Sequence, residues 1–178
     1  ANQQTFETFK LVGEEFPDLI KCMSTNGLLL PESLDRLHAL GLHSLTVTIN
    51  AVSPDTAAQI YRHVYYHGKR YSGKDAAEIL LASQYEGVQR AVELGMVVKV
   101  NTVLIPGINE TEVPLIAERI KGLGAFVMNV MPLIPQAELA HIPAPTAEHL
   151  AEVRNNNEQI ISQMRHCKQC RADAIGLL

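Results

Sequence analysis

Three cysteines carry the clearest chemical signal in this 178-residue sequence: Cys22 near the start, and Cys167 and Cys170 near the end. The spacing of Cys167 and Cys170 places two thiolates one helical turn apart. This is the local geometry with which a cysteine pair binds zinc or an iron-sulfur cluster. Two thiolates do not complete a four-ligand site. The pair therefore recruits Cys22 and histidines such as His166, acts as a dithiol, or is incomplete because other ligands lie in an absent part of the protein.

Ligation is a better interpretation of this pair than redox exchange. A thioredoxin-like dithiol follows a strand and opens a helix, whereas Cys167 and Cys170 follow a helical pattern. Cys22 belongs to a strand pattern, where a cysteine is ordinarily a small core residue. Its place close to the end of that strand favours a functional position instead. The sequence holds no HExxH motif, no glycine-rich phosphate loop and no nucleophile elbow.

Composition narrows the classes of function. The chain is 47% hydrophobic, enough for one sizeable core. Fifteen basic and nineteen acidic residues give a net charge of -4, and no basic run with interleaved aromatics occurs, which argues against a nucleic-acid partner. The odd number of cysteines, without a signal segment or a stretch of eighteen apolar residues, predicts a cytoplasmic protein with no membrane partner and no disulfides.

Three helix exits share one pattern, in which a glycine follows the last apolar residue of a helix and a β-branched run comes next. The glycines are Gly41, Gly95 and Gly124, and the runs span residues 44–50, 97–103 and 126–131. Such a glycine closes a helix in the left-handed conformation, and the run predicts a buried strand. With a further strand at residues 19–24, the pattern predicts four parallel strands joined by outer helices. Four units are too few for a closed barrel, so we expect part of a larger α/β barrel.

Start signals for the helices agree with this order. Proline after Ser53 and after Leu30 marks two first turns, and Asn109 with Glu112 predicts a capping box. The first helix is expected at residues 5–15, and residues 61–71 are expected to form an amphipathic excursion. The barrel part is expected over residues 1–143. Residues 144–178 are expected to form a last helix and the Cys-x-x-Cys tail, with one apolar face made by Leu150, Val153, Ile160 and Met164.

Every predicted strand supplies an asparagine near its end or within it: Asn26, Asn50, Asn101 and Asn129. Sites in parallel α/β folds lie at the carboxyl ends of the strands, where four amides would offer donors and acceptors to a polar metabolite. Asparagine is also common in turns, which is the ordinary interpretation of Asn26 and Asn50. Asn101 lies inside an apolar strand, where a buried amide needs partners, and is therefore the stronger site candidate.

Several segments together resemble the radical S-adenosylmethionine enzymes, and among them the nitrogenase cofactor maturases. The resemblance covers nearly the whole chain. The more widely shared barrel segments are residues 24–31 (STNGLLLP), 101–109 (NTVLIPGIN) and 131–134 (MPLI). The more specific segments are residues 46–51 (TVTINA) and the tail 166–178 (HCKQCRADAIGLL).

The resemblance implies a lyase-like synthase that uses S-adenosylmethionine and 4Fe-4S clusters. Members of the family transfer the methyl carbon of S-adenosylmethionine to two further 4Fe-4S clusters, which fuse into a carbide-centred precursor of the nitrogenase cofactor. The mapping makes Cys22 a ligand of one substrate cluster, and Cys167 and Cys170 ligands of the other. It implies iron-sulfur cluster donors and cofactor carrier or scaffold proteins as partners. The residues that it places around S-adenosylmethionine are Thr25, Asn26, Asn50, Asn101, Ile105, Asn129 and Met131.

The sequence departs from the family at one essential point. The family holds its reductive cluster on a Cys-x-x-x-Cys-x-x-Cys loop, and no cysteines have that spacing here. A glycine-rich strand that binds the methionine amino group is also absent. We therefore expect the carboxyl-terminal portion of such an enzyme, inactive alone. Two alternatives remain: a metal or iron-sulfur carrier without radical chemistry, and a cofactor-free barrel enzyme that uses the asparagine rim.

Overall fold

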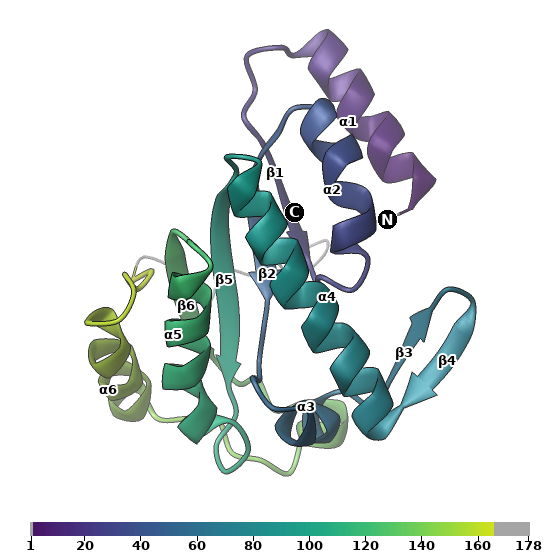
Figure 1. Ribbon diagram of the computed structural model, residues 1–178. Coiled ribbons are helices and arrows are strands. Elements are labelled where there is room, and N and C mark those ends of the chain that lie inside the picture. Colours follow the sequence, from purple (N-terminus) through teal and green to yellow (C-terminus); the bar gives the residue numbers. More distant parts are fainter. Residues whose placement is uncertain (1, 166–178) are drawn as a thin grey trace.

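A parallel sheet forms the centre of the computed structural model, which describes residues 2–165 (Figure 1). The tail residues His166, Cys167 and Cys170 lie outside the described part. The sheet order is β1-β2-β5-β6, and all three neighbouring pairs are parallel. The strands are β1 (Lys21–Thr25), β2 (Leu42–Thr48), β5 (Val97–Leu104) and β6 (Val127–Pro132). The predicted α/β fold with four parallel strands is confirmed.

Residues 2–165 also form six α-helices and two short 3-10 turns. They are α1 (Gln3–Glu15), α2 (Leu30–Ala39), α3 (Pro54–Ile60), α4 (Gly73–Glu93), η1 (Glu110–Glu112), α5 (Val113–Gly122), η2 (Ala137–Leu139) and α6 (Ala147–Glu158). The helix exits behave as their glycines predict, because Gly41, Gly95 and Gly124 all have positive φ. The Ser53 hydroxyl caps α3 by accepting from the Thr56 N–H, as its position before proline indicates.

The core lies between the helices and one face of the sheet. Figure 1 shows α2, α4 and α5 in front of the strands, and the buried apolar residues of both layers form one cluster. Its largest fully buried members include Leu34, Leu37, Leu45, Val47, Ile116 and Ile120. Helices α2 and α4 approach closely at Gly87, where a Cβ would lie 2.7 Å from Leu30 Cδ2. Only glycine lets the two helices pack at this separation.

A two-stranded antiparallel hairpin interrupts the repeat between α3 and α4. It consists of β3 (His63–Tyr66) and β4 (Lys69–Ser72) and extends away from the sheet (Figure 1). His67 and Gly68 form the turn, both with positive φ, which matches the twist of a two-residue hairpin. The sequence pattern of residues 61–71 predicted only an amphipathic excursion, and the hairpin was not predicted.

The predicted capping box of Asn109 and Glu112 is wrong. Asn109 makes no side-chain cap, and α5 begins at Val113 after the turn η1. Both side chains instead reach across to the loop after β2, where buried backbone groups need partners. The hydrogen bonds of Asn109 and Glu112 to the loop after β2 therefore replace the local capping bonds that the sequence pattern predicts.

The last helix is shorter than its apolar pattern indicates. Helix α6 ends at Glu158, so Ile160 and Met164 lie beyond it. The chain then runs extended beside β6, where the Met128 N–H donates to Ser162 O at 3.0 Å and the Met164 N–H donates to Met128 O at 2.8 Å. These two backbone hydrogen bonds form a short parallel bridge between Met128 and Gln163 at the outer edge of β6. The chain pairs with β6 here and does not continue the helix.

Candidate functional site

The sheet has two chemically different faces. Within residues 2–165, the face opposite the core carries no helical layer, and its side chains follow the register of the strands. These side chains are Cys22 and Ser24 of β1, Ser44, Thr46 and Thr48 of β2, Val97, Lys99, Asn101 and Val103 of β5, and Val127, Asn129 and Met131 of β6. We call this surface the open face. Its polar character contrasts with the Leu and Val side chains beneath the helices.

Asn101 and Asn129 meet on the β5–β6 side of the open face. They are register partners on β5 and β6, and Asn129 Nδ2 donates to Asn101 Oδ1 at 3.1 Å. Both are buried, with exposed fractions of 4% and 0%. Asn129 Oδ1 has no hydrogen-bond partner in the described part of the chain. A buried acceptor without a partner is costly, and Asn129 Oδ1 shares this property with Gln84 Oε1, Asn157 Oδ1 and Gln163 Oε1.

Asn50 lies beside this pair just after β2, and both polar atoms of its side chain have hydrogen-bond partners within the protein. Its Oδ1 accepts from the Val103 N–H at 2.9 Å, and its Nδ2 donates to the Tyr61 hydroxyl at 2.9 Å. Burial is the main cause that raises the pKa of Tyr61 to about 12, so this hydroxyl stays protonated at neutral pH. Asn50 thus ties the end of β2 to β5 and to the residue after α3.

Asn109 holds the same edge from the loop after β5. Its Nδ2 donates to Asn50 O at 2.9 Å and to Val103 O at 2.8 Å, and its Oδ1 accepts from the Ile105 N–H at 2.8 Å. Its side chain is fully buried. Three strong hydrogen bonds from one amide fix the carboxyl ends of β2 and β5 relative to each other.

Glu112 clamps the loop that follows Asn50. One carboxylate oxygen accepts from the Val52 and Ser53 N–H groups at 2.6 and 3.1 Å, and the other accepts from the Ser53 and Thr56 hydroxyls at 2.6 and 2.7 Å. Burial alone would raise the pKa of Glu112, but these hydrogen bonds together outweigh it and hold the pKa below its ordinary value. A charged carboxylate therefore anchors the start of α3.

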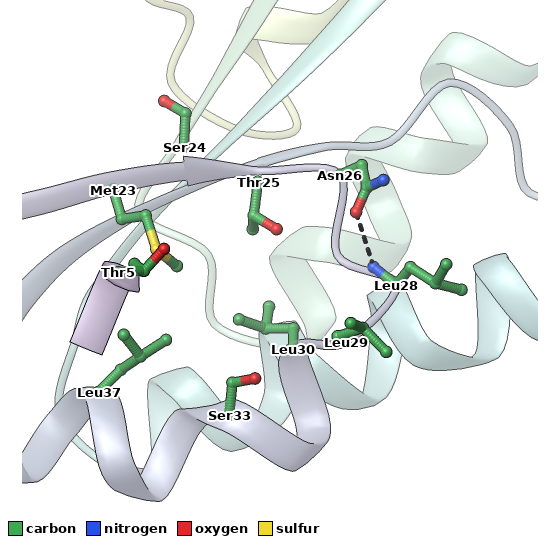
Figure 2. Close-up of a pocket in the computed structure, with 10 residues that line it drawn as sticks. All are labelled: Thr5, Met23, Ser24, Thr25, Asn26, Leu28, Leu29, Leu30, Ser33 and Leu37. Atoms are coloured by element: carbon green, nitrogen blue, oxygen red, sulfur yellow. Dashed lines mark hydrogen bonds between the residues drawn. The ribbon is translucent and has the colours of Figure 1, made fainter. Parts of the chain in front are cut away.

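Thr25 and Asn26 serve the turn after β1. Asn26 Oδ1 accepts from the Leu28 N–H at 3.1 Å, and Thr25 Oγ1 accepts from the Gly27 N–H at 3.1 Å. Figure 2 shows Met23 and Thr25 pointing into a pocket between β1 and α2, while Ser24 points to the other side of the strand. The pocket has a volume of about 240 Å³, and four of its ten lining residues are leucines. Thr25 therefore does not share the open face with the other candidates.

Ile105 and Met131 complete the set expected from the sequence. Met131 is half-buried on the open face, opposite Val103 in the register of β5 and β6. Ile105 is buried with Leu133 and Ile142 just beyond β5. The structure thus brings Asn101, Asn129 and Met131 onto one surface and places Ile105 at its border.

Cys22 is exposed on the open face, at the outer strand of the sheet. Residues 2–165 contain no group of three or more His, Cys, Asp or Glu side chains that could hold a metal ion. Cys167 and Cys170 fall outside the described part, so their relation to Cys22 stays a prediction. Any cluster at Cys22 needs ligands from beyond residues 2–165.

Five polar residues of the open face were not predicted from the sequence: Ser24, Ser44, Thr46, Thr48 and Lys99. The signal was present, because strand side chains alternate and these residues lie at two-residue steps from Cys22, Asn50 and Asn101. Asn109 and Glu112 were noticed only as a helix start. Their contacts join segments more than fifty residues apart, which local patterns do not reveal.

Comparison with known proteins agrees with this geometry. The family model of the radical SAM superfamily matches residues 3–120. The chain belongs to the radical SAM superfamily. It is 47% identical to the FeMo cofactor biosynthesis protein NifB of Klebsiella pneumoniae, over 98% of this chain and 39% of that protein. It is 46% identical to NifB of Methanocaldococcus infernus, over 99% of this chain and 58% of the relative. The chain therefore spans about two fifths to three fifths of these relatives.

Solved structures share the fold at low sequence identity. A domain of the pyruvate-formate lyase-activating enzyme from Bacteroides vulgatus matches 91% of this chain and 89% of its own with a TM-score of 0.64 at 14% identity. The radical S-adenosylmethionine methyltransferase TsrM from Kitasatospora setae matches 76% of this chain and 26% of its own with a TM-score of 0.53 at 17% identity. These matches support the radical SAM type of α/β fold. Among residues 2–165, no helix has the length and apolar character that crossing a membrane requires.

Proposed function

We propose that this chain is part of a radical S-adenosylmethionine enzyme that builds the precursor of the nitrogenase iron-molybdenum cofactor. Identity of 40 to 47% to NifB proteins over 98 to 99% of the chain is the observation that carries this proposal. The substrates are two 4Fe-4S clusters, which fuse around a carbide. S-adenosylmethionine, bound at its own 4Fe-4S cluster, supplies the carbon and the radical when it is present.

The open face fits S-adenosylmethionine through its amides. The free acceptor at Asn129 Oδ1 suits an amino group, which the adenine ring and the methionine part both carry. Asn101 holds Asn129 in place, and Met131 offers an apolar side chain beside it. Asn26 and Thr25 shape the turn at the outer strand, while Asn50 and Ile105 position the border of the open face through bonds to Val103 and Asn109.

Cys22, Cys167 and Cys170 are the proposed ligands of the two substrate clusters. Cys22 presents an exposed thiol on the open face, which is the same surface as the amide pair. The sequence has no Cys-x-x-x-Cys-x-x-Cys spacing, so the cluster that reduces S-adenosylmethionine has no site among these 178 residues. We infer that the chain alone does not cleave S-adenosylmethionine.

Binding of S-adenosylmethionine to the complete protein tests the amide pair. We expect Asn101→Leu to raise the dissociation constant by about 5- to 150-fold, which corresponds to about 1 to 3 kcal/mol for a lost buried hydrogen bond. Asn157→Leu is the matched control, because Asn157 is 1% exposed, also has an unpartnered Oδ1 and lies on α6. Isothermal titration gives the constant, and thermal unfolding monitors the fold. Equal affinity in both variants would assign Asn101 to structure.

The proposed partners are iron-sulfur cluster donors and a carrier or scaffold for the product, and the proposed location is the cytoplasm. The hairpin β3–β4 offers a surface for such an exchange. Lys69 and Arg70 of the hairpin are exposed, and residues 61–72 contain no acidic side chain, whereas Arg62 beside the hairpin pairs with Glu138. In a chain of net charge -4, this local positive charge favours a partner with an acidic surface.

A further inference from the structure

Lys99 is the only charged side chain that the four strands place on the open face. It is half-buried in β5, and it makes no ion pair or side-chain hydrogen bond with any residue between 2 and 165. Two other lysines have partners: Lys21 Nζ donates to Leu40 O at 2.7 Å, and Lys74 pairs with Asp55 at 3.0 Å. An ammonium with no counter-charge among residues 2–165 offers a positive charge and three donors, so this position fits an anionic ligand.

Hydroxyl groups extend from Lys99 toward the outer strand. Thr46 is its register partner on β2, and Ser24 is the register partner of Thr46 on β1. Paired residues of parallel strands point to the same face, so an ammonium and two hydroxyls form one row across three strands. Such a row can donate several hydrogen bonds to an anion but carries no acceptor charge of its own.

Cys22 lies next to this row. It is on the same face of β1, two residues before Ser24. Strand spacing and rise place the Cα atoms of Cys22 and Lys99 about 12 Å apart, since they are separated by two strands and two residues. The long side chain of Lys99 and a cluster bound to the Cys22 thiolate can together span this separation, so the ammonium can contact the cluster. Thiolates and sulfides make iron-sulfur clusters anionic, and nearby hydrogen bonds and charge tune them.

We propose that Lys99 is the counter-charge that holds the anionic substrate cluster anchored by Cys22, with the Ser24 and Thr46 hydroxyls donating to its sulfides. This inference rests on the proposed role of Cys22 as a cluster ligand. Lys99 acts as a positioning residue: it forms no bond to iron and undergoes no chemical change. Its charge confines the cluster to the open face, close to Asn101 and Asn129.

Retention of iron in the complete protein tests the inference without any turnover. After anaerobic reconstitution, iron and sulfide are counted per chain, and iron release to a chelator is followed in time. We expect Lys99→Met to release the Cys22-dependent iron at least about tenfold faster than the unmodified protein, the factor that corresponds to about 1.4 kcal/mol. Lys99→Arg keeps the charge and should stay within about twofold. Lys121→Met, at an exposed lysine of α5, is the control for charge loss elsewhere.

Comparison with Cys22→Ala separates the two proposals. Cys22→Ala should remove one cluster's worth of iron, and adding Lys99→Met to it should change nothing further. If Cys22→Ala lowers iron but Lys99→Met releases it at the unmodified rate, the counter-charge is refuted and the cluster role of Cys22 stands. If Cys22→Ala keeps all its iron, the ligand role fails and the inference fails with it. A Lys99→Met effect that persists in the Cys22→Ala background would also overturn the inference.

Discussion

Removing the charge of Glu112 is expected to loosen the loop that carries Asn50. In Glu112→Gln, one oxygen can still accept from the Val52 and Ser53 N–H groups, while the amide nitrogen must face the two hydroxyls, which can rotate to accept from it. The loss is therefore that of charge assistance, about 2 kcal/mol of the free energy of unfolding. Glu112→Ala leaves two buried N–H groups without partners and should cost about 3 to 5 kcal/mol.

Urea unfolding of the purified chain at pH 7 measures both values. Glu118→Gln is the control, because Glu118 is exposed on α5, the helix that follows Glu112. The pH dependence provides a second test, since the pKa of Glu112 is lowered in the folded state. Its stabilisation is fully present above the unfolded pKa of about 4.3 and is lost as pH falls through the lower folded pKa. A Glu112→Gln loss no larger than that of Glu118→Gln would refute the clamp.

Four further outcomes follow from the structure. Asn109→Ala removes three buried hydrogen bonds and should lower the free energy of unfolding by about 2 to 4 kcal/mol in the same urea assay. Gly87→Ala should lose about 1 to 3 kcal/mol through its clash with Leu30, whereas Gly122→Ala, with open space around it, should be neutral or stabilising. In the complete protein, replacing Cys167 and Cys170 with alanine should lower bound iron by about one cluster, additively with Cys22→Ala; unchanged iron would contradict their role. The 178-residue chain, reconstituted with iron and sulfide, should yield no 5'-deoxyadenosine from S-adenosylmethionine under dithionite, and any product would contradict this.

Much of the fold could be predicted because local signals and tertiary packing agree. The glycines after α2, α4 and α5 close helices, and the β-branched runs after them can only be buried strands. The hairpin could not be predicted in this way. Its two strands have four residues each and few apolar side chains, and its turn depends on His67 adopting a positive φ.

The candidate site was only partly predictable for a related reason. Asn101 stood out as an amide within an apolar strand, and the structure gives it the expected polar partner. That this partner is Asn129 depends on the register of β5 and β6, which sequence patterns leave open. Asn50 follows a strand, as turn asparagines commonly do, yet its side chain bonds Tyr61 after α3 and Val103 of β5.

The central claim is that this chain helps to transfer a carbon from S-adenosylmethionine into an iron-sulfur product, and a labelled methyl group tests it most directly. The complete protein, reconstituted anaerobically with iron and sulfide, is given S-adenosylmethionine labelled at its methyl carbon and a reductant. We predict that label accumulates in the protein-bound iron-sulfur fraction and that Cys22→Ala abolishes this accumulation. Cleavage of S-adenosylmethionine with no label in that fraction, or label that persists in Cys22→Ala, would contradict the account.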